Sequence, residues 1–418
     1  MPAWYGNHSR PTVRQIESML RLLRPDFEYV ASTRNDVELA EEAIRKFTEE
    51  QFDALDHLED NRRVIFKGPA GTGKTFLAIE AARRAVLDGR SVALLCFNGL
   101  LATWLRRETA AIGDEAKARS IPFYAGNLSG LMRQVADADV PTTADRRFWE
   151  IELPERAVDA LLDDGREKPT FDLLLVDEAQ DLLSDPFLDV MELLLSGGLA
   201  SGRWAMFGDF ERQAIYADNR ANSGLELLQS RAADNISTYR LRINCRNATR
   251  IAEAVTITCG LSPGYSRILN TTDSADVEPV FYRSTSHQAE LLLATIAKLL
   301  KSFAPAEIVI LSMRSDASSC VALLDREQDR WQFNSYREMP EGGASVRYVS
   351  VHAFKGLEAP AIILTDIEGV DDEQAKALLY VGMSRARVRL HVLMHERLRS
   401  RYDAMVDAGL KAALKRNS

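Results

Sequence analysis

Short apolar runs alternate with amphipathic stretches along the chain from residue 63 onward. An apolar run of about four to eight residues predicts a buried strand, and apolar positions three and four apart predict a helix. The predicted strands are residues 63–67, 91–96, 172–176, 203–207, 237–243, 279–282, 307–311, 346–351, 360–364 and 388–393. Strands that alternate with helices form parallel sheets, and ten strands are many for one open sheet. We therefore predict an α/β protein with two parallel sheets in tandem.

The same pattern divides the chain into three parts. Residues 1–47 form an accessory segment with helical periodicity, interrupted at Pro25. We place the first sheet domain at residues 48–235, with a small helical insertion at about 113–165. The second sheet domain takes residues 236–418.

Composition indicates an ordinary globular protein, with 46% hydrophobic and 27% charged residues among 418. The net charge of −9 argues against a protein that coats nucleic acid through a global basic field, although a local basic cleft stays compatible with it. The four cysteines form no C-x-x-C pair, so we expect neither zinc nor a disulfide framework. No apolar run approaches the roughly 18 residues of a membrane span, and the N-terminus lacks a signal-peptide core. We expect a cytoplasmic protein with no membrane partner.

A phosphate-loop pattern, G-x-x-x-x-G-K-[ST], follows the first predicted strand and precedes a predicted helix. In this context the backbone N–H groups wrap a triphosphate at the helix N-terminus. Lys74 reaches the β and γ oxygens, and the Thr75 hydroxyl ligates Mg²⁺. The residues predicted to bind the triphosphate are Gly68, Pro69, Ala70, Gly71, Thr72, Gly73, Lys74 and Thr75.

Two carboxylates follow the buried strand at 172–176. A carboxylate at the C-terminal edge of a strand binds Mg²⁺, and its neighbour polarises the attacking water. We assign the metal role to Asp177 and the general-base role to Glu178. The alternative, a solvated acidic turn, is disfavoured by the phosphate loop upstream.

Residues 177–181, Asp-Glu-Ala-Gln-Asp, resemble motif II of superfamily 1 helicases of the UvrD/Rep-like group. Other segments resemble further motifs of this family in the same order. These are Gly208–Tyr216 for motif III, Asn244–Asn247 for motif IV, Val351–Glu358 for motif V and Tyr380–Arg387 for motif VI. Gln51 resembles the glutamine of the Q motif, and the resemblance covers about residues 48–395.

The resemblance implies two tandem RecA-like domains of the P-loop NTPase class, with ATP and Mg²⁺ bound between them. It also implies a role for each matching residue. Gln51 would bond the adenine edge, and Gln213 would sense the γ-phosphate. Arg246 and Arg385 would be arginine fingers, and Glu358 would contact the ribose.

For nucleic acid, the resemblance points to Phe97 and Asn98 in the place of motif Ia and to His352 in motif V. Tyr216 is a further candidate for stacking on a base. Trp104 lies beyond motif Ia, where a buried position on an amphipathic helix is an equally good interpretation.

Three departures from the family pattern stand out. Cys245 occupies the place of a tyrosine that stacks on adenine, and Phe76 the place of an arginine. We predict that Phe76 takes over part of the adenine stacking, because its aromatic ring offers a flat face. The stretches that hold the large 1B and 2B accessory domains in full-size helicases are short here, so only a small 1B-like addition is expected.

The first hypothesis is an ATP-dependent single-stranded DNA translocase or helicase of superfamily 1, acting in DNA repair or in defence against foreign DNA. Its partner would be single-stranded or partly duplex DNA, with RNA left open because no residue is seen to read a 2′-hydroxyl. The second is a nucleic-acid-stimulated ATPase that serves as motor or sensor for a nuclease or effector subunit. The third is a P-loop ATP switch that does not translocate.

Overall fold

The computed structural model describes residues 37–38, 49–165, 167–210, 221–232, 235–262, 264–272, 277, 279–328, 330–338 and 344–417. The predicted accessory segment 1–47 therefore lies outside the described residues, apart from residues 37–38. In the described part of the chain, no helix is long and apolar enough to cross a membrane.

The first sheet holds six strands that all run parallel, in the order β3-β2-β4-β5-β1-β6. These strands are β1 (Arg63–Lys67), β2 (Val92–Cys96), β3 (Phe123–Asn127), β4 (Leu173–Val176), β5 (Arg203–Gly208) and β6 (Ser237–Arg240). The inner strands β2 and β4 are buried along their whole length. Strands covered on both faces read as continuous apolar runs, which is why the sequence pattern predicted them well.

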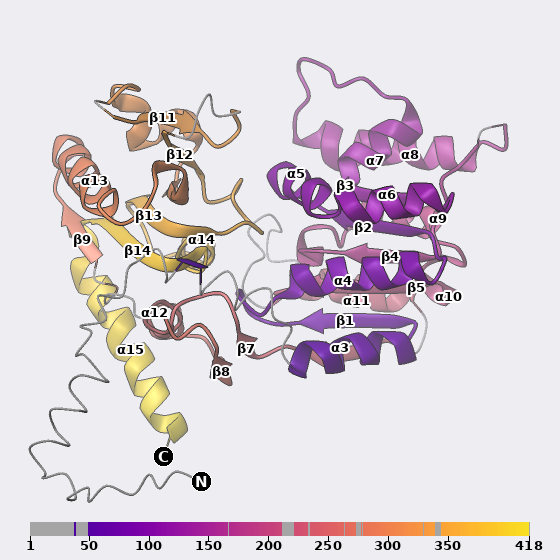
Figure 1. The fold of residues 1–418 in the computed structure, drawn as a ribbon, viewed down its shortest axis with the longest axis horizontal. Helices are drawn as coiled ribbons and strands as arrows, with labels where there is room; N and C mark the ends of the chain where they lie inside the picture. The colour runs from indigo at the N-terminus through magenta and orange to yellow at the C-terminus, as the bar shows by residue number, and fades with distance from the viewer. Residues whose placement is uncertain are drawn as a thin grey trace, which may run out of the picture.

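Helices cover both faces of this sheet (Figure 1). They are α3 (Glu49–Asp60), α4 (Lys74–Leu87), α5 (Gly99–Glu108), α6 (Ala110–Ala118), α7 (Leu128–Ala136), α8 (Leu153–Leu162), α9 (Asp185–Leu194), α10 (Gly198–Ser201) and α11 (Ala221–Arg231). Helix α4 buries Leu77, Ala78, Ala81, Ala82 and Ala85, a stripe at helical spacing. That stripe fixes the direction in which the start of α4 points.

The second sheet also holds six parallel strands, in the order β11-β12-β10-β13-β14-β9. They are β9 (Pro279–Tyr282), β10 (Ile308–Ser312), β11 (Gln332–Ser335), β12 (Ser345–Ser350), β13 (Ala359–Ile367) and β14 (Ala386–His395). Its helices are α12 (Thr249–Thr258), α13 (Thr285–Leu299), α14 (Glu373–Met383) and α15 (Arg399–Asn417). Two short strands, β7 (Ile243–Asn244) and β8 (Arg267–Ile268), pair beside it. The prediction of two tandem parallel sheets is confirmed.

The structure differs from the sequence prediction at the sheet edges. Strand β6 pairs with β1, so the first sheet extends past the seam predicted at residue 235. Strand β3 lies within the insertion predicted to be helical and forms the opposite edge of that sheet. Strand β11, an edge of the second sheet, was not predicted at all. Edge strands face solvent on one side and carry polar residues, so their apolar pattern is weak.

The two sheets share one apolar core cluster, which runs from α4 and α5 to β12, β13 and α14. The two parts of the chain come close at Gly356, whose φ is +87°. A Cβ atom added there would lie 2.6 Å from the Leu101 side chain. The second sheet therefore packs directly on the first, and Figure 1 shows them side by side.

Candidate functional site

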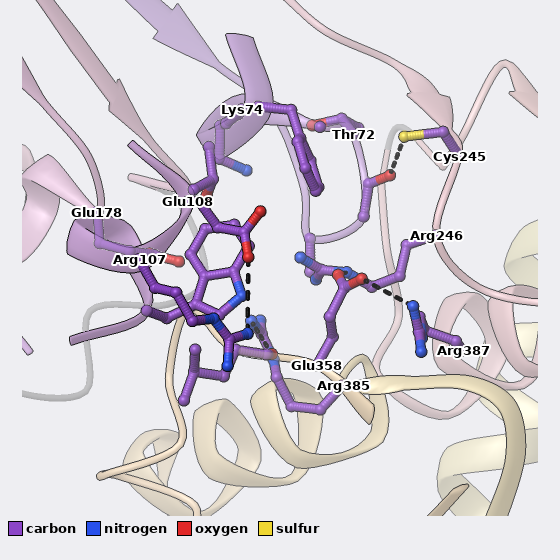
Figure 2. A pocket seen from close by; sticks show the side chains of 18 of the residues that line it. Thr72, Lys74, Arg107, Glu108, Glu178, Cys245, Arg246, Glu358, Arg385 and Arg387 are labelled. Carbon is purple, nitrogen blue, oxygen red and sulfur yellow. Dashed lines mark hydrogen bonds and ion pairs between the residues drawn. The ribbon is translucent and has the colours of Figure 1, made fainter. Parts of the chain in front are cut away.

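A cavity of about 300 Å³ lies between the two sheets. The first sheet contributes residues 70–76 and Glu178, and the second contributes Arg246, Glu358 and Arg385. Figure 2 shows Lys74 and Glu178 facing these residues across the cavity. Five of the lining side chains are positively charged and three are negatively charged. Since the whole chain carries a net charge of −9, this local surplus of cations favours an anionic ligand.

The phosphate loop forms a tight turn before α4. Gly71 and Gly73 have φ values of +84° and +78°, in the left-handed region that favours glycine. At Gly71, an added Cβ would lie 2.9 Å from the side-chain amide of Asn244, which belongs to β7. Helix α4 begins at Lys74, so its N-terminal N–H groups and the positive end of its dipole face the cavity.

Lys74 is buried beside the loop. Its Nζ donates hydrogen bonds to the carbonyl oxygens of Gly68 (2.7 Å) and Pro69 (3.0 Å). Burial lowers the pKa of Lys74, while the carboxylates of Asp209, Glu178 and Asp177 act in the opposite direction. The ammonium is thus held at the mouth of the loop, where a bound anion would replace its carbonyl partners.

Asp177 follows β4 and lies next to the start of α4. The Thr75 hydroxyl donates to Asp177 Oδ2 at 2.7 Å. Asp177 Oδ1 is buried and finds no hydrogen-bond partner among the described residues. Burial raises the pKa of Asp177 to about 6, and the adjacent Glu178 charge adds to this effect. An orphaned buried carboxylate oxygen marks a place where a ligand is expected.

Glu178 has an unusual backbone conformation. Its φ and ψ are 51° and 42°, which costs a non-glycine residue free energy and is common at functional sites. Gln180 Nε2 donates to Glu178 Oε2 at 2.6 Å and orients the carboxylate. Burial alone would raise the pKa of Glu178, but Lys355, Lys74 and Arg385 together hold it below its ordinary value. The side chain is therefore an oriented, ionised carboxylate at neutral pH.

The second sheet places three arginines around the cavity. Arg246 pairs with the Glu358 carboxylate, and Arg387 Nη1 lies 3.9 Å from its other oxygen. Arg385 is buried, and burial together with the charge of Arg246 lowers its pKa to about 10. Within the described part of the chain, the hydrogen bonds of the Arg385 guanidinium go to carbonyl and hydroxyl oxygens. Two buried cations that repel each other favour an anion between them and the loop.

Gln51 lies behind the phosphate loop and does not line the cavity. Its Nε2 donates to the Thr72 carbonyl at 3.2 Å, and the side chain is only 3% exposed. The structure therefore brings Gln51 to the loop, while contact with adenine stays a prediction. Cys245 lines the cavity, and its Sγ donates to the Gly71 carbonyl at 3.2 Å. Burial raises the pKa of Cys245 to about 11, so it stays a thiol.

Aromatic side chains form one wall of the cavity. Phe76 lies edge-on to Trp104, with ring centroids 5.9 Å apart, and both line the cavity. Tyr336 of the second sheet lines it as well. The sequence was compatible with either a nucleic-acid contact or a buried position for Trp104. It did not indicate Tyr336, because no motif surrounds that residue. The stacking role of Phe76 stays a prediction.

Phe97, Asn98 and His352, the described residues predicted to bind nucleic acid, do not line this cavity. Asn98 Oδ1 caps α5, and its Nδ2 donates to the carbonyls of Ala353 (2.8 Å) and His352 (3.3 Å). Phe97 is half-buried against Phe187. Burial, together with the charge of Lys355, lowers the pKa of His352, so it is neutral at pH 7. The Asn98 side chain thus connects the start of α5 with the loop before β13, and its nucleic-acid role stays a prediction.

Two other predicted residues, Gln213 and Tyr216, lie outside the described residues.

A buried ion pair also joins the two sheets. Lys355 Nζ lies 2.6 Å from Asp181 Oδ2, and the side chains are 1% and 2% exposed. Burial raises the pKa of Asp181 to about 6, against the opposing effect of Lys355. The pair lies next to Glu178 and connects the end of β4 with the loop before β13.

Comparison with known families agrees with this geometry. Residues 345–393 match the sequence profile of the UvrD-like helicase C-terminal domain. This stretch is similar to the C-terminal domain of UvrD-like helicases. Residues 11–113, which include the phosphate loop, match the profile of IstB-like ATP binding proteins. The protein is therefore a helicase-like ATP-binding protein, with the loop in one match and Arg385 in the other. No protein in a curated set matches the chain.

Solved structures of helicases are similar in fold. A structure of the DEAD-box helicase Mss116 bound to ssRNA and UDP-BeF has a TM-score of 0.52 at 13% identity, covering 86% of this chain and 73% of that one. A crystal structure of arterivirus nonstructural protein 10 (helicase) has a TM-score of 0.37 at 14% identity, covering 82% of this chain. The matched region spans 61% of the length of the arterivirus protein. The fold is that of two RecA-like domains of the P-loop NTPase class.

Proposed function

We propose that the protein hydrolyses ATP in the cavity between the two sheets and couples this cycle to movement along single-stranded DNA. The observation that carries the proposal is the lining of one cavity by Lys74 and Glu178 from the first sheet and by Arg246 and Arg385 from the second. Phosphoryl transfer needs a phosphate cradle, an oriented water and cations that balance the charge developing on the γ-phosphate. Each of these requirements has a side chain available here.

In the proposed reaction a water attacks the γ-phosphorus, and the bond to the β–γ bridging oxygen breaks. Glu178 accepts the proton of that water; its lowered pKa keeps the carboxylate ionised, and the hydrogen bond from Gln180 orients it. Lys74, Arg246 and Arg385 neutralise the charge on the transferred group. ADP and inorganic phosphate leave.

The site also suits Mg²⁺. The Thr75 hydroxyl and the Asp177 carboxylate lie side by side, and Asp177 Oδ1 is orphaned. No cluster of three or more His, Cys, Asp or Glu able to hold a metal occurs among the described residues. Mg²⁺ is commonly held by one or two protein oxygens together with substrate phosphates, so this sparse donor set fits. When bound, the ion would polarise the phosphate oxygens.

We propose that the first domain ends after β6 and that the second begins at β7, because β6 belongs to the first sheet. ATP contacts made from both domains would favour the closed arrangement, and loss of phosphate would weaken it. In helicases this alternation drives stepping on a strand. DNA as the substrate, and a role in repair or defence against foreign DNA, rest on the resemblance to UvrD-like helicases. The Mss116 structure, which holds ssRNA, keeps RNA as the competing substrate.

The test is steady-state ATP hydrolysis by the full chain with and without single-stranded DNA, and with RNA of the same sequence. We expect turnover that rises with DNA and disappears in Lys74→Ala. Equal turnover with and without either nucleic acid would contradict coupling to a strand. Full turnover by Lys74→Ala would contradict the site itself.

A second candidate, an ATPase motor or sensor subunit that does not unwind alone, is favoured by one observation. Strands β9, β10, β11 and β12, between Arg246 and Lys355, all belong to the second sheet. Within the described residues this stretch therefore builds the core and forms no separate accessory domain. Strand displacement by the pure protein distinguishes this candidate from a helicase.

A further inference from the structure

A buried tyrosine joins the phosphate loop to the second sheet. Tyr380 lies on α14, and its Oη accepts a hydrogen bond from the backbone N–H of Ala70 at 2.8 Å. The same Oη donates to Asp209 Oδ2, also at 2.8 Å. The exposed fractions of Tyr380 and Asp209 are 2% and 4%, so water does not compete for these bonds. Burial beside Asp209 raises the pKa of Tyr380, so the phenol stays protonated and can donate.

The same helix carries Arg385 just beyond its end. Arg385 Nε donates to the carbonyl of Val381 at 3.0 Å, and Nη2 donates to Ser384 Oγ at 3.2 Å. Val381 follows Tyr380 directly in the chain. The guanidinium is therefore folded back onto the turn that Tyr380 ties to the loop. A shift of this turn away from Ala70 would carry the guanidinium with it.

A second tyrosine holds the same residue of the loop by a different route. Tyr265 Oη donates to the Ala70 carbonyl at 2.8 Å. Tyr265 precedes β8 and is not part of α14. The two tyrosines thus bond opposite ends of the Ala70 residue, but only one of them shares a helix turn with Arg385. Neither tyrosine lines the cavity.

We propose that Tyr380 is a positioning residue, which sets the place of the Arg385 guanidinium relative to the phosphate loop. The inference rests on the proposed ATP hydrolysis. Tyr380 acts through Arg385 and touches no substrate. Because a cation must lie within hydrogen-bond reach of the transferred phosphate, a shift of about 1 Å is expected to cost rate rather than binding.

The test is a double-mutant cycle on steady-state hydrolysis, made of Tyr380→Phe, Arg385→Lys and the double variant. We expect Tyr380→Phe to lower kcat by roughly tenfold or more, with KM changed less than about threefold. In the Arg385→Lys background the same change should lower kcat less than about twofold, because the group it positions is already altered. Equal losses in both backgrounds would overturn the proposal.

Tyr265→Phe is the matched control, since it also removes one buried phenol hydroxyl bonded to Ala70. We expect it to lower kcat less than about threefold, and a loss equal to that of Tyr380→Phe would assign both to general support of the loop. Thermal unfolding checks that the variants fold. If Tyr380→Phe does not fold, Asp209→Asn replaces it in the cycle with the same expectation. Absence of turnover in the wild type would refute the proposed function itself, whereas additive losses would refute this inference alone.

Discussion

The two sheets have the same number of strands and the same parallel direction, yet they offer different chemistry to the cavity between them. In the first sheet, β1 is followed by a loop that can cradle phosphates, and β4 is followed by the two carboxylates of Asp177 and Glu178. The second contributes Arg246, Arg385 and Arg387. Under the proposed function, the first sheet binds the nucleotide and the second stabilises the charge that develops when it reacts. The difference predicts that binding and catalysis respond separately to changes on the two sides.

The largest effect should come from the second sheet. Removing the Arg385 guanidinium in Arg385→Ala should lower kcat by about 10³ to 10⁵, the usual cost of losing an arginine finger. Binding of a fluorescent ATP analogue should change little, because the loop remains. Arg250→Ala is the control, since Arg250 is 59% exposed and pairs with Glu253 on the surface. If Arg385→Ala lost nucleotide binding as strongly as kcat, the assignment of binding to the first sheet and catalysis to the second would be contradicted.

A change on the first sheet should trap the substrate. Glu178→Gln keeps the size of the side chain but removes the proton acceptor, so hydrolysis should fall by about 10² to 10⁴. The variant should still bind ATP, since Lys74 and the loop are intact. Release of radiolabelled phosphate measures the first effect and filter binding the second. Phosphate release at the wild-type rate would exclude Glu178 as the base.

The ion pair that joins the sheets should affect stability. Lys355→Met leaves the buried Asp181 carboxylate without its cation, which should cost about 3–5 kcal/mol in the free energy of unfolding at pH 7.5. Burial raises the pKa of Asp181 to about 6 against an ordinary value of 3.8, so the folded state holds this proton more tightly than the unfolded state. Below pH 6 Asp181 is protonated and needs no cation, so the cost should shrink there.

The surface variant Lys376→Met is the control for this measurement, with an expected change within about 0.5 kcal/mol. A cost for Lys355→Met that is independent of pH would show that Asp181 does not titrate in this way.

A smaller effect on stability should come from a histidine of the second sheet and should depend on pH. Burial lowers the pKa of His391, on β14, to about 4 from an ordinary 6.5. The unfolded state therefore binds a proton that the folded state resists between pH 6.5 and 4, and stability falls as the pH is lowered through this window. The loss attributable to His391 should reach about 3 kcal/mol. Urea unfolding of His391→Phe at several pH values should show a shallower decline, and an unchanged slope would contradict the assignment.

The chemistry of the first sheet was predictable because its signals are local in sequence. The strand, loop and helix around Lys74 and the strand before Asp177 carry their spacing within a few residues, and the structure brings these side chains together. Arg246 and Arg385 came from a resemblance in motif order, and both line the cavity.

Other features depend on how one sheet packs on the other, which no local pattern encodes. The bond between Tyr380 and Ala70 joins residues 310 positions apart. The Asn98 amide donates to the carbonyls of His352 and Ala353 in the loop between β12 and β13, a contact that the sequence did not predict. Strands β3 and β11 escaped prediction because polar edges weaken the apolar alternation.

The most direct measurement is a crystal structure of the full chain with ADP, Mg²⁺ and aluminium fluoride, which mimics the transferred phosphate. We expect the fluoride to contact Lys74 Nζ on one side and the guanidinium groups of Arg246 and Arg385 on the other. A nucleotide bound to the loop alone, with both arginines turned away from the fluoride, would contradict a site shared by the two sheets.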